Sequence, residues 1–226
     1  HRDLHSFPTR RSSDLAAGKT GIALRATLAE LAVQHLILVL VSGAASVAAG
    51  TLLGAAAVLS GGRDFRDLLL NLSSFTETLP SAAIIALAVP VLGYGTEPTL
   101  LALFLYGILP VLRNTITGLE GVDPDIVEAA RGTGMGGLRT LVSVRAPLAL
   151  PVVLAGIRTS VIITISAATL GAAVGSGGFG VPIVSGIRTF DPVMILRGAV
   201  PVTLLALLAD SLLRRLSEAA GVKFRR

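Results

Sequence analysis

Residues 128–151 read EAARGTGMGGLRTLVSVRAPLALP, and this stretch separates long apolar runs. It contains four charged residues, four glycines and two prolines. Glycine and proline favour turns and helix ends, and charged side chains are costly inside a bilayer. The stretch therefore predicts a polar, sharply turned segment at the edge of an otherwise apolar bundle.

The composition of the whole chain places it in a membrane. Of its 226 residues, 52% are hydrophobic and only 15% are charged, and the mean hydropathy is +0.78. The net charge of +5 does not indicate nucleic-acid binding, because the basic residues lie between apolar runs and at the chain ends rather than on one basic face. The sequence has no cysteine and three histidines, two of them among the first five residues, so we predict neither a disulfide nor a metal site.

The first fifteen residues, HRDLHSFPTRRSSDL, are polar and basic and unlike everything that follows. They do not have the charge, apolar core and cleavage-site order of a signal peptide. They resemble translated adapter sequence, so residues 1–15 are predicted to be foreign or disordered.

Five mainly apolar runs are candidates for membrane spans. A helix needs about 20 such residues to cross the hydrocarbon layer. The predicted spans cover residues 36–59, 78–92, 98–118, 147–174 and 194–213.

The basic residues give the predicted orientation, since Lys and Arg are enriched on the cytoplasmic side. They lie between the first and second spans, in the loop at 123–146 and in the tail at 219–226. The link at 93–97 has no basic residue, although Lys19 and Arg25 weaken the contrast near the N-terminus. The pattern predicts a multi-pass membrane protein, with its N-terminus outside and its C-terminus inside.

The loop at 123–146 is predicted to be a helix, a glycine turn and a second amphipathic helix. Asp123 and Pro124 are typical of a helix start, and Gly132 and Gly134 of a helix end. Ile126 and Ala130 are expected to share one face of the first helix. From these physical features alone, a hairpin that rests on the lipid headgroups is an equal alternative to a functional loop.

The motif favours the functional interpretation. EAARGTG, followed nine residues later by VRAP, resembles the EAA loop of binding-protein-dependent ABC importer permeases. That pattern is E-A-A, three residues, G, nine residues, then I-x-L-P, and Val144 and Ala146 depart from it conservatively. The matching residues are Glu128, Ala129, Ala130, Gly134 and Pro147.

The resemblance extends over about 190 residues, which gives a predicted permease domain at 27–218, and is to the quaternary-amine osmoprotectant permeases, which handle glycine betaine, carnitine and choline. It implies a location in the bacterial plasma (inner) membrane. It implies an all-α membrane protein with the type I ABC importer permease fold, of the methionine-permease kind, with about five transmembrane helices. It also implies that the chain is a transport subunit, not an enzyme. ATP and Mg²⁺ would be bound by a separate cytoplasmic ATPase dimer, and this chain would bind no cofactor itself.

The other partners implied by the resemblance are an extracytoplasmic substrate-binding protein and a second permease copy or paralogue. An importer permease for another small solute, such as methionine, is the nearest alternative function. An ion-gradient carrier or a channel is a more distant one, since few acidic residues lie in the apolar runs.

A glycine motif follows the fourth predicted span. The sequence GSGGFG formally satisfies a dinucleotide-binding pattern, but it follows a membrane span rather than a strand. An external turn is therefore the favoured interpretation, and the resemblance implies a position near the external mouth. Its glycines are Gly175, Gly177, Gly178 and Gly180.

Four charged residues in or near the spans are candidates for the transport pathway or for ion pairs: Glu77, Arg113, Arg158 and Asp210. The favoured interpretation of Arg113, Arg158 and Asp210 is that they anchor helix ends at the membrane surface. The alternative is a cluster of ion pairs inside the membrane. Glu77 is either a solvated charge at the start of a span or a carboxylate that attracts a quaternary ammonium group.

Overall fold

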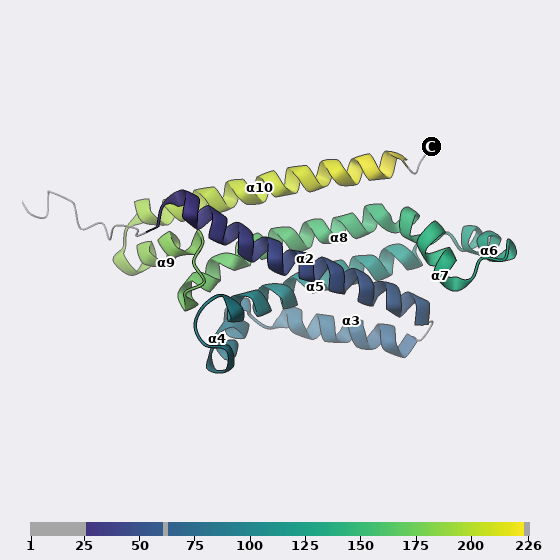
Figure 1. The fold of residues 1–226 in the computed structure, drawn as a ribbon, viewed down its shortest axis with the longest axis horizontal. Helices are drawn as coiled ribbons and strands as arrows, with labels where there is room; N and C mark the ends of the chain where they lie inside the picture. The colour runs from purple at the N-terminus through teal and green to yellow at the C-terminus, as the bar shows by residue number, and fades with distance from the viewer. Residues whose placement is uncertain (1–25, 61–62, 224–226) are drawn as a thin grey trace, which may run out of the picture.

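A computed structural model describes residues 26–60 and 63–223, and the predicted foreign segment at 1–15 lies outside them. All the elements in these two ranges are helical (Figure 1). They are α2 (Leu28–Ser60), α3 (Arg63–Thr78), α4 (Ser81–Leu92), α5 (Thr96–Glu120), α6 (Pro124–Gly132), α7 (Gly137–Thr140), the π-helical η1 (Leu141–Arg145), α8 (Ala146–Ala167), the 3₁₀ helix η2 (Ala168–Val174), α9 (Gly180–Thr189) and α10 (Pro192–Lys223).

Four of the helical segments are long and apolar enough to cross a membrane. They are Leu28–Leu59, Thr96–Glu120, Gly137–Val174 and Pro192–Ala219. Many large apolar side chains on them are exposed, as expected of surfaces that contact lipid or another subunit. The expected fold class, an all-α membrane protein, is confirmed.

The predicted second span at 78–92 differs from the structure. Here α4 has only 12 residues, which is about 18 Å at 1.5 Å per residue and too short to cross the hydrocarbon layer. Pro80 separates α4 from α3, and the chain uses both helices to return from the end of α2 to the start of α5 (Figure 1). The apolar-run criterion missed α3 because this helix is amphipathic and only one of its faces is apolar.

Two helix ends also lie beyond the predicted spans. A reciprocal cap explains the early start of α2, since the Thr27 N–H donates to Glu30 Oε2 at 2.6 Å and the Glu30 N–H donates to Thr27 Oγ1 at 3.2 Å. At the other end of the chain, α10 runs to Lys223, so much of the predicted basic tail at 219–226 is helical.

The segments predicted to be cytoplasmic and those predicted to be external lie at opposite ends of the bundle. The end of α2, the start of α3, α6, α7 and the end of α10 lie at one end, whereas α9 and the start of α2 lie at the other (Figure 1). The arginine-rich segments α6 and α7 therefore lie on one side of the bundle, which the charge rule predicts to be the cytoplasmic side.

The centre of the bundle is α5, which packs between α2 and α8. Small residues let these helices approach closely, and hydroxyl groups link them. Ser46 Oγ donates to the Phe104 carbonyl at 3.0 Å, and Ser160 Oγ donates to the Gly107 carbonyl at 2.7 Å. A side chain at Gly156 would meet the Pro110 carbonyl oxygen at 2.6 Å. The α5–α8 contact therefore depends on the absence of a side chain at Gly156.

We expect Gly156→Ala to destabilise the bundle by about 1 to 3 kcal/mol, because the added methyl group overlaps the α5 backbone. The measurement is the midpoint of thermal unfolding by circular dichroism in detergent. Gly43→Ala is the matched control, since a side chain at Gly43 on α2 meets nothing within 4 Å. Equal midpoints for the two variants would contradict the close α5–α8 contact.

Candidate functional site

The predicted coupling helix is the short α6, and its sequence caps it at both ends. The Asp123 side chain accepts a hydrogen bond from the Asp125 N–H at 2.9 Å, and Pro124 occupies the first turn. Val127 and Ala130 are buried, whereas Glu128 and Ala129 are exposed. Of the two residues predicted to share one face, Ala130 is buried and Ile126 is exposed.

The turn after α6 has the hydrogen bonds of a Schellman motif. The Gly134 N–H donates to the Arg131 carbonyl at 2.9 Å, and the Met135 N–H donates to the Ala130 carbonyl at 3.3 Å. This geometry places Gly134 at φ +85°, which is the left-handed region that favours glycine. The glycine of the EAA pattern therefore has a backbone conformation that a side chain would strain.

The predicted second helix of the hairpin is not a separate surface element. The helical segment runs from Gly137 through α7, η1 and α8 without a break. A wide π turn, closed by the Ala146 N–H and the Leu141 carbonyl, directly precedes Pro147. Such a turn accommodates a proline that lacks its own N–H, so the helix passes Pro147 without ending. Any displacement at the glycine turn would therefore pass directly into the α8 span.

Two of the four predicted charged residues pair with each other inside the bundle. Arg158 on α8 and Asp210 on α10 form a forked contact, with Nε to Oδ1 at 2.6 Å and Nη2 to Oδ2 at 2.9 Å. Their side chains are only 37% and 30% exposed. The structure thus contains the ion pair between these two residues that the alternative interpretation described. The forked, charge-assisted contact joins α8 to α10.

The two remaining charged candidates both involve α3. Arg113 on α5 donates from Nη2 to Ser74 Oγ on α3 at 2.8 Å. Glu77 lies in the last turn of α3, and its side chain lies outside the described part of the structure.

The glycine motif at 175–180 forms the link between η2 and α9, at the opposite end of the bundle from α6 (Figure 1). Gly175, Gly177 and Gly178 have φ values of +89°, +80° and +75°, which favour glycine. Gly180 begins α9, and a side chain there would collide with the Thr169 carbonyl. The glycines thus allow a tight turn that packs α9 against η2.

Two polar residues on α2 hold this glycine turn in place. The Gly178 N–H donates to Gln34 Oε1 at 2.9 Å. The neighbouring His35 is fully buried, with Nε2 at 3.1 Å from the Ile165 carbonyl and its ring 5.4 Å from the ring of Phe179. The sequence analysis missed both residues, although an adjacent polar pair inside an apolar helix was a signal that could have identified them.

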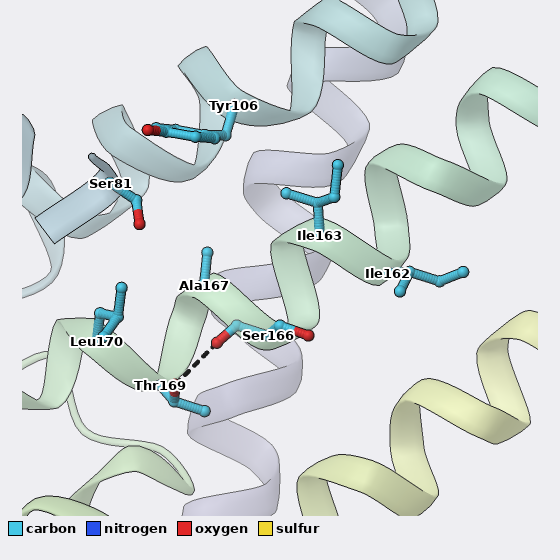
Figure 2. A pocket seen from close by; sticks show the side chains of 8 residues that line it. All are labelled: Ser81, Tyr106, Ile162, Ile163, Ser166, Ala167, Thr169 and Leu170. Atoms are coloured by element: carbon cyan, nitrogen blue, oxygen red, sulfur yellow. Dashed lines mark hydrogen bonds between the residues drawn. The ribbon is translucent and has the colours of Figure 1, made fainter. Parts of the chain in front are cut away.

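A cavity of about 440 Å³ opens between α4, α5, α8 and η2. Figure 2 shows Tyr106 and Ser81 on one side of it and Ala167 and Leu170 on the other. The Thr169 hydroxyl donates to the Ser166 carbonyl at 2.8 Å and so does not need another partner there. The remaining lining residues are Ile162 and Ile163. The cavity can hold a small, largely apolar group beside one aromatic ring.

Residues 46–221 match the family described as the binding-protein-dependent transport system inner membrane component. The chain belongs to this family. Members are multi-pass components of the inner membrane, which agrees with the long apolar helices of the structure.

Several curated proteins are similar in sequence. The chain is 46% identical over 140 residues to the glycine betaine/carnitine/choline transport system permease protein OpuCB of Bacillus subtilis, with 62% of this chain and 64% of that protein covered. It is 37% identical over 194 residues to the osmoprotectant import permease protein OsmW of Salmonella typhimurium, with 84% and 89% covered. The alignment thus spans slightly less than two thirds of the Bacillus relative and most of the Salmonella one.

Solved structures show the same fold. A chain of the MetNI methionine ABC transporter, crystallised in an inward-facing conformation, superposes on this chain with a TM-score of 0.74 at 18% identity. The superposition covers 85% of this chain and 95% of that one. An amino acid ABC transporter crystallised with histidines gives a TM-score of 0.63 at 14% identity, with 85% and 91% covered. The predicted type I ABC importer permease fold is therefore confirmed.

We expect the Arg158–Asp210 pair to be energetically coupled. Arg158→Gln or Asp210→Asn alone leaves one charge without its partner between apolar helices, so each variant should unfold at a lower temperature. The double variant should lose less than the sum of the two single losses, because it leaves no unpaired charge. Thermal midpoints in detergent measure this, with the exposed Arg188→Gln as control. Additive losses would show that the two side chains do not interact.

Proposed function

We propose that this chain is the transmembrane permease subunit of an ATP-driven importer for quaternary-amine osmoprotectants such as glycine betaine, choline or carnitine. The observation that carries the proposal is the 37% identity with an osmoprotectant import permease over 84% of this chain. Shorter alignments to carnitine and choline permeases at 43% and 45% identity point to the same substrate class. The likeness to the methionine transporter is at 18% identity and supports the fold, not methionine as substrate.

The structure suggests how ATP hydrolysis by a partner moves this chain. The exposed Glu128 and Ala129 give α6 a surface for a cleft in a cytoplasmic ATPase dimer, which would bind ATP and Mg²⁺. The Schellman turn at Gly134 holds α6 at a defined angle to the helix that begins at Gly137. Because that helix continues into α8, motion of α6 tilts a membrane span directly. In this mechanism Pro147 lies where the moving segment enters the membrane.

The surface of the bundle supports the remaining proposed partners. Its exposed apolar side chains suit a second permease copy or a paralogue as well as lipid. The glycine turn at 175–180 lies on the side opposite α6, where an extracytoplasmic binding protein would dock. Selection of the quaternary amine would reside mainly in that binding protein, since Tyr106 is the only aromatic ring among the described residues that line the cavity of Figure 2.

Reconstitution tests the proposed activity. Vesicles that contain this chain, its cognate ATPase and its binding protein should take up radiolabelled glycine betaine, choline or carnitine only when ATP is present. Vanadate should abolish the uptake and an uncoupler should not, because the energy comes from ATP and not from an ion gradient. Uptake of methionine but of none of the three quaternary amines would reject the substrate class, and uptake driven by an ion gradient would reject the importer mechanism.

A paired substitution tests the coupling turn. Gly134→Val should leave the protein in the membrane but reduce ATP-driven uptake at least tenfold, because a β-branched residue at φ +85° disrupts the Schellman turn. Gly136→Val is the matched control, since Gly136 has φ −68° and ψ 165°, which valine readily adopts. Membrane content by immunoblot and uptake are measured together. Full uptake with Gly134→Val would rule out the proposed role of the turn.

A further inference from the structure

A small cavity lies on the cytoplasmic side of the bundle, between the end of α2 and the glycine turn. It has a volume of about 60 Å³, roughly twice the share of one water molecule in the liquid. Its lining comes from α2, α6, α7 and η1, and consists of Val58, Leu59, Arg131, Gly137, Thr140, Leu141 and Arg145. The two charged members are both arginines, and none of the seven is acidic.

The charge of this cavity is not balanced by the protein contacts that the described residues provide. Nε of Arg145 is buried and has no hydrogen-bond partner among them. A buried guanidinium N–H without an acceptor is costly, so a ligand that supplies an acceptor would stabilise the site. By contrast, the Thr140 hydroxyl is satisfied by the Gly136 carbonyl at 3.1 Å. The unmet hydrogen-bonding capacity therefore comes from arginine, whose fork matches a phosphate group.

The apolar surroundings indicate which phosphate compound fits. Leu59 is 44% exposed at the rim of the cavity, and Leu52, seven residues earlier on the same face of α2, is 70% exposed. On the η1 side, Val142 is 61% exposed. An acyl chain could therefore run along α2 toward the membrane centre while its headgroup enters the cavity. A free phosphate ion would gain nothing from these apolar side chains.

We propose that Arg131 and Arg145 form a binding site for the phosphate headgroup of an anionic phospholipid from the cytoplasmic leaflet. Basic pockets at the cytoplasmic ends of membrane helices are suited to such headgroups. Arg131 lies on α6 and Arg145 on η1, so one bound lipid contacts both sides of the glycine turn. The lipid would thereby hold α6 against the end of α2. This site adds to the proposed function and does not depend on it.

Lipid binding to the purified full-length chain tests the site without any transport assay. In neutral detergent, native mass spectrometry should show retention of phosphatidylglycerol in preference to phosphatidylcholine. Arg131→Gln and Arg145→Gln should each weaken phosphatidylglycerol binding about 5- to 10-fold, as expected for one arginine contact at a membrane surface. Arg139→Gln is the matched control, because it removes the same charge from an exposed position on α7 outside the cavity. It should leave the affinity unchanged.

Any one of three other outcomes would overturn the proposal. An equal loss with Arg139→Gln would show a diffuse charge effect and not a site. Competition by inorganic phosphate at concentrations similar to those of the lipid would show a free-anion site. Displacement of the lipid when the cognate ATPase binds would assign the two arginines to a carboxylate of that subunit.

A folding control is needed for Arg145, whose side chain is partly buried. Circular dichroism at 222 nm reports whether Arg145→Gln remains helical, and Arg145→Lys preserves the charge but lacks the guanidinium fork. We expect Arg145→Lys to bind with intermediate affinity. If Arg145→Gln misfolds, the exposed Arg131 decides the result, and unchanged affinity of Arg131→Gln would reject the site.

Discussion

The constraint on which this structure depends is that a backbone group inside a bilayer must find its hydrogen-bond partner within the protein. The continuous helix from Gly137 to Val174 shows how the chain meets it at a difficult point. Pro147 and Pro151 remove two N–H donors near the membrane surface, where a break would otherwise separate the glycine turn from the span. The π turn of η1 keeps the helix intact there. The polar loop and the membrane span thus form one mechanical unit.

Once the backbone is satisfied, close packing decides how the spans associate. In hydrocarbon the hydrophobic effect gives apolar helices little driving force to associate. Van der Waals contact and a few polar links between the helices therefore hold the spans together. Gly156 allows α8 to approach α5, and the hydroxyl groups of Ser46 and Ser160 join α5 to its two neighbours. Arg158 and Asp210 then attach α10 to α8. These contacts therefore connect α2, α5, α8 and α10 through the centre of the bundle.

Local sequence signals predicted much of the fold and of the candidate coupling site. The Asp123 cap, the helix end near Gly132 and the left-handed Gly134 all follow from the properties of individual residues. The division of the second crossing into α3 and α4 did not follow, because an amphipathic helix between charged residues has no long apolar run. The burial of Val127 and the exposure of Ile126 did not follow either, since the direction from which the bundle contacts a short helix is not encoded in that helix alone.

The sequence by itself determined that the chain is an all-α membrane protein with a capped polar helix between apolar spans, because hydropathy, capping and glycine conformation are local properties. Only the tertiary structure decided which distant residues meet. It paired Arg158 with Asp210, placed Gln34 against the turn at Gly178, and brought Arg131 and Arg145 to one cavity beside the end of α2. These contacts join residues far apart along the chain, or on either side of a turn. They depend on the packing angles of whole helices, which no short stretch of sequence specifies.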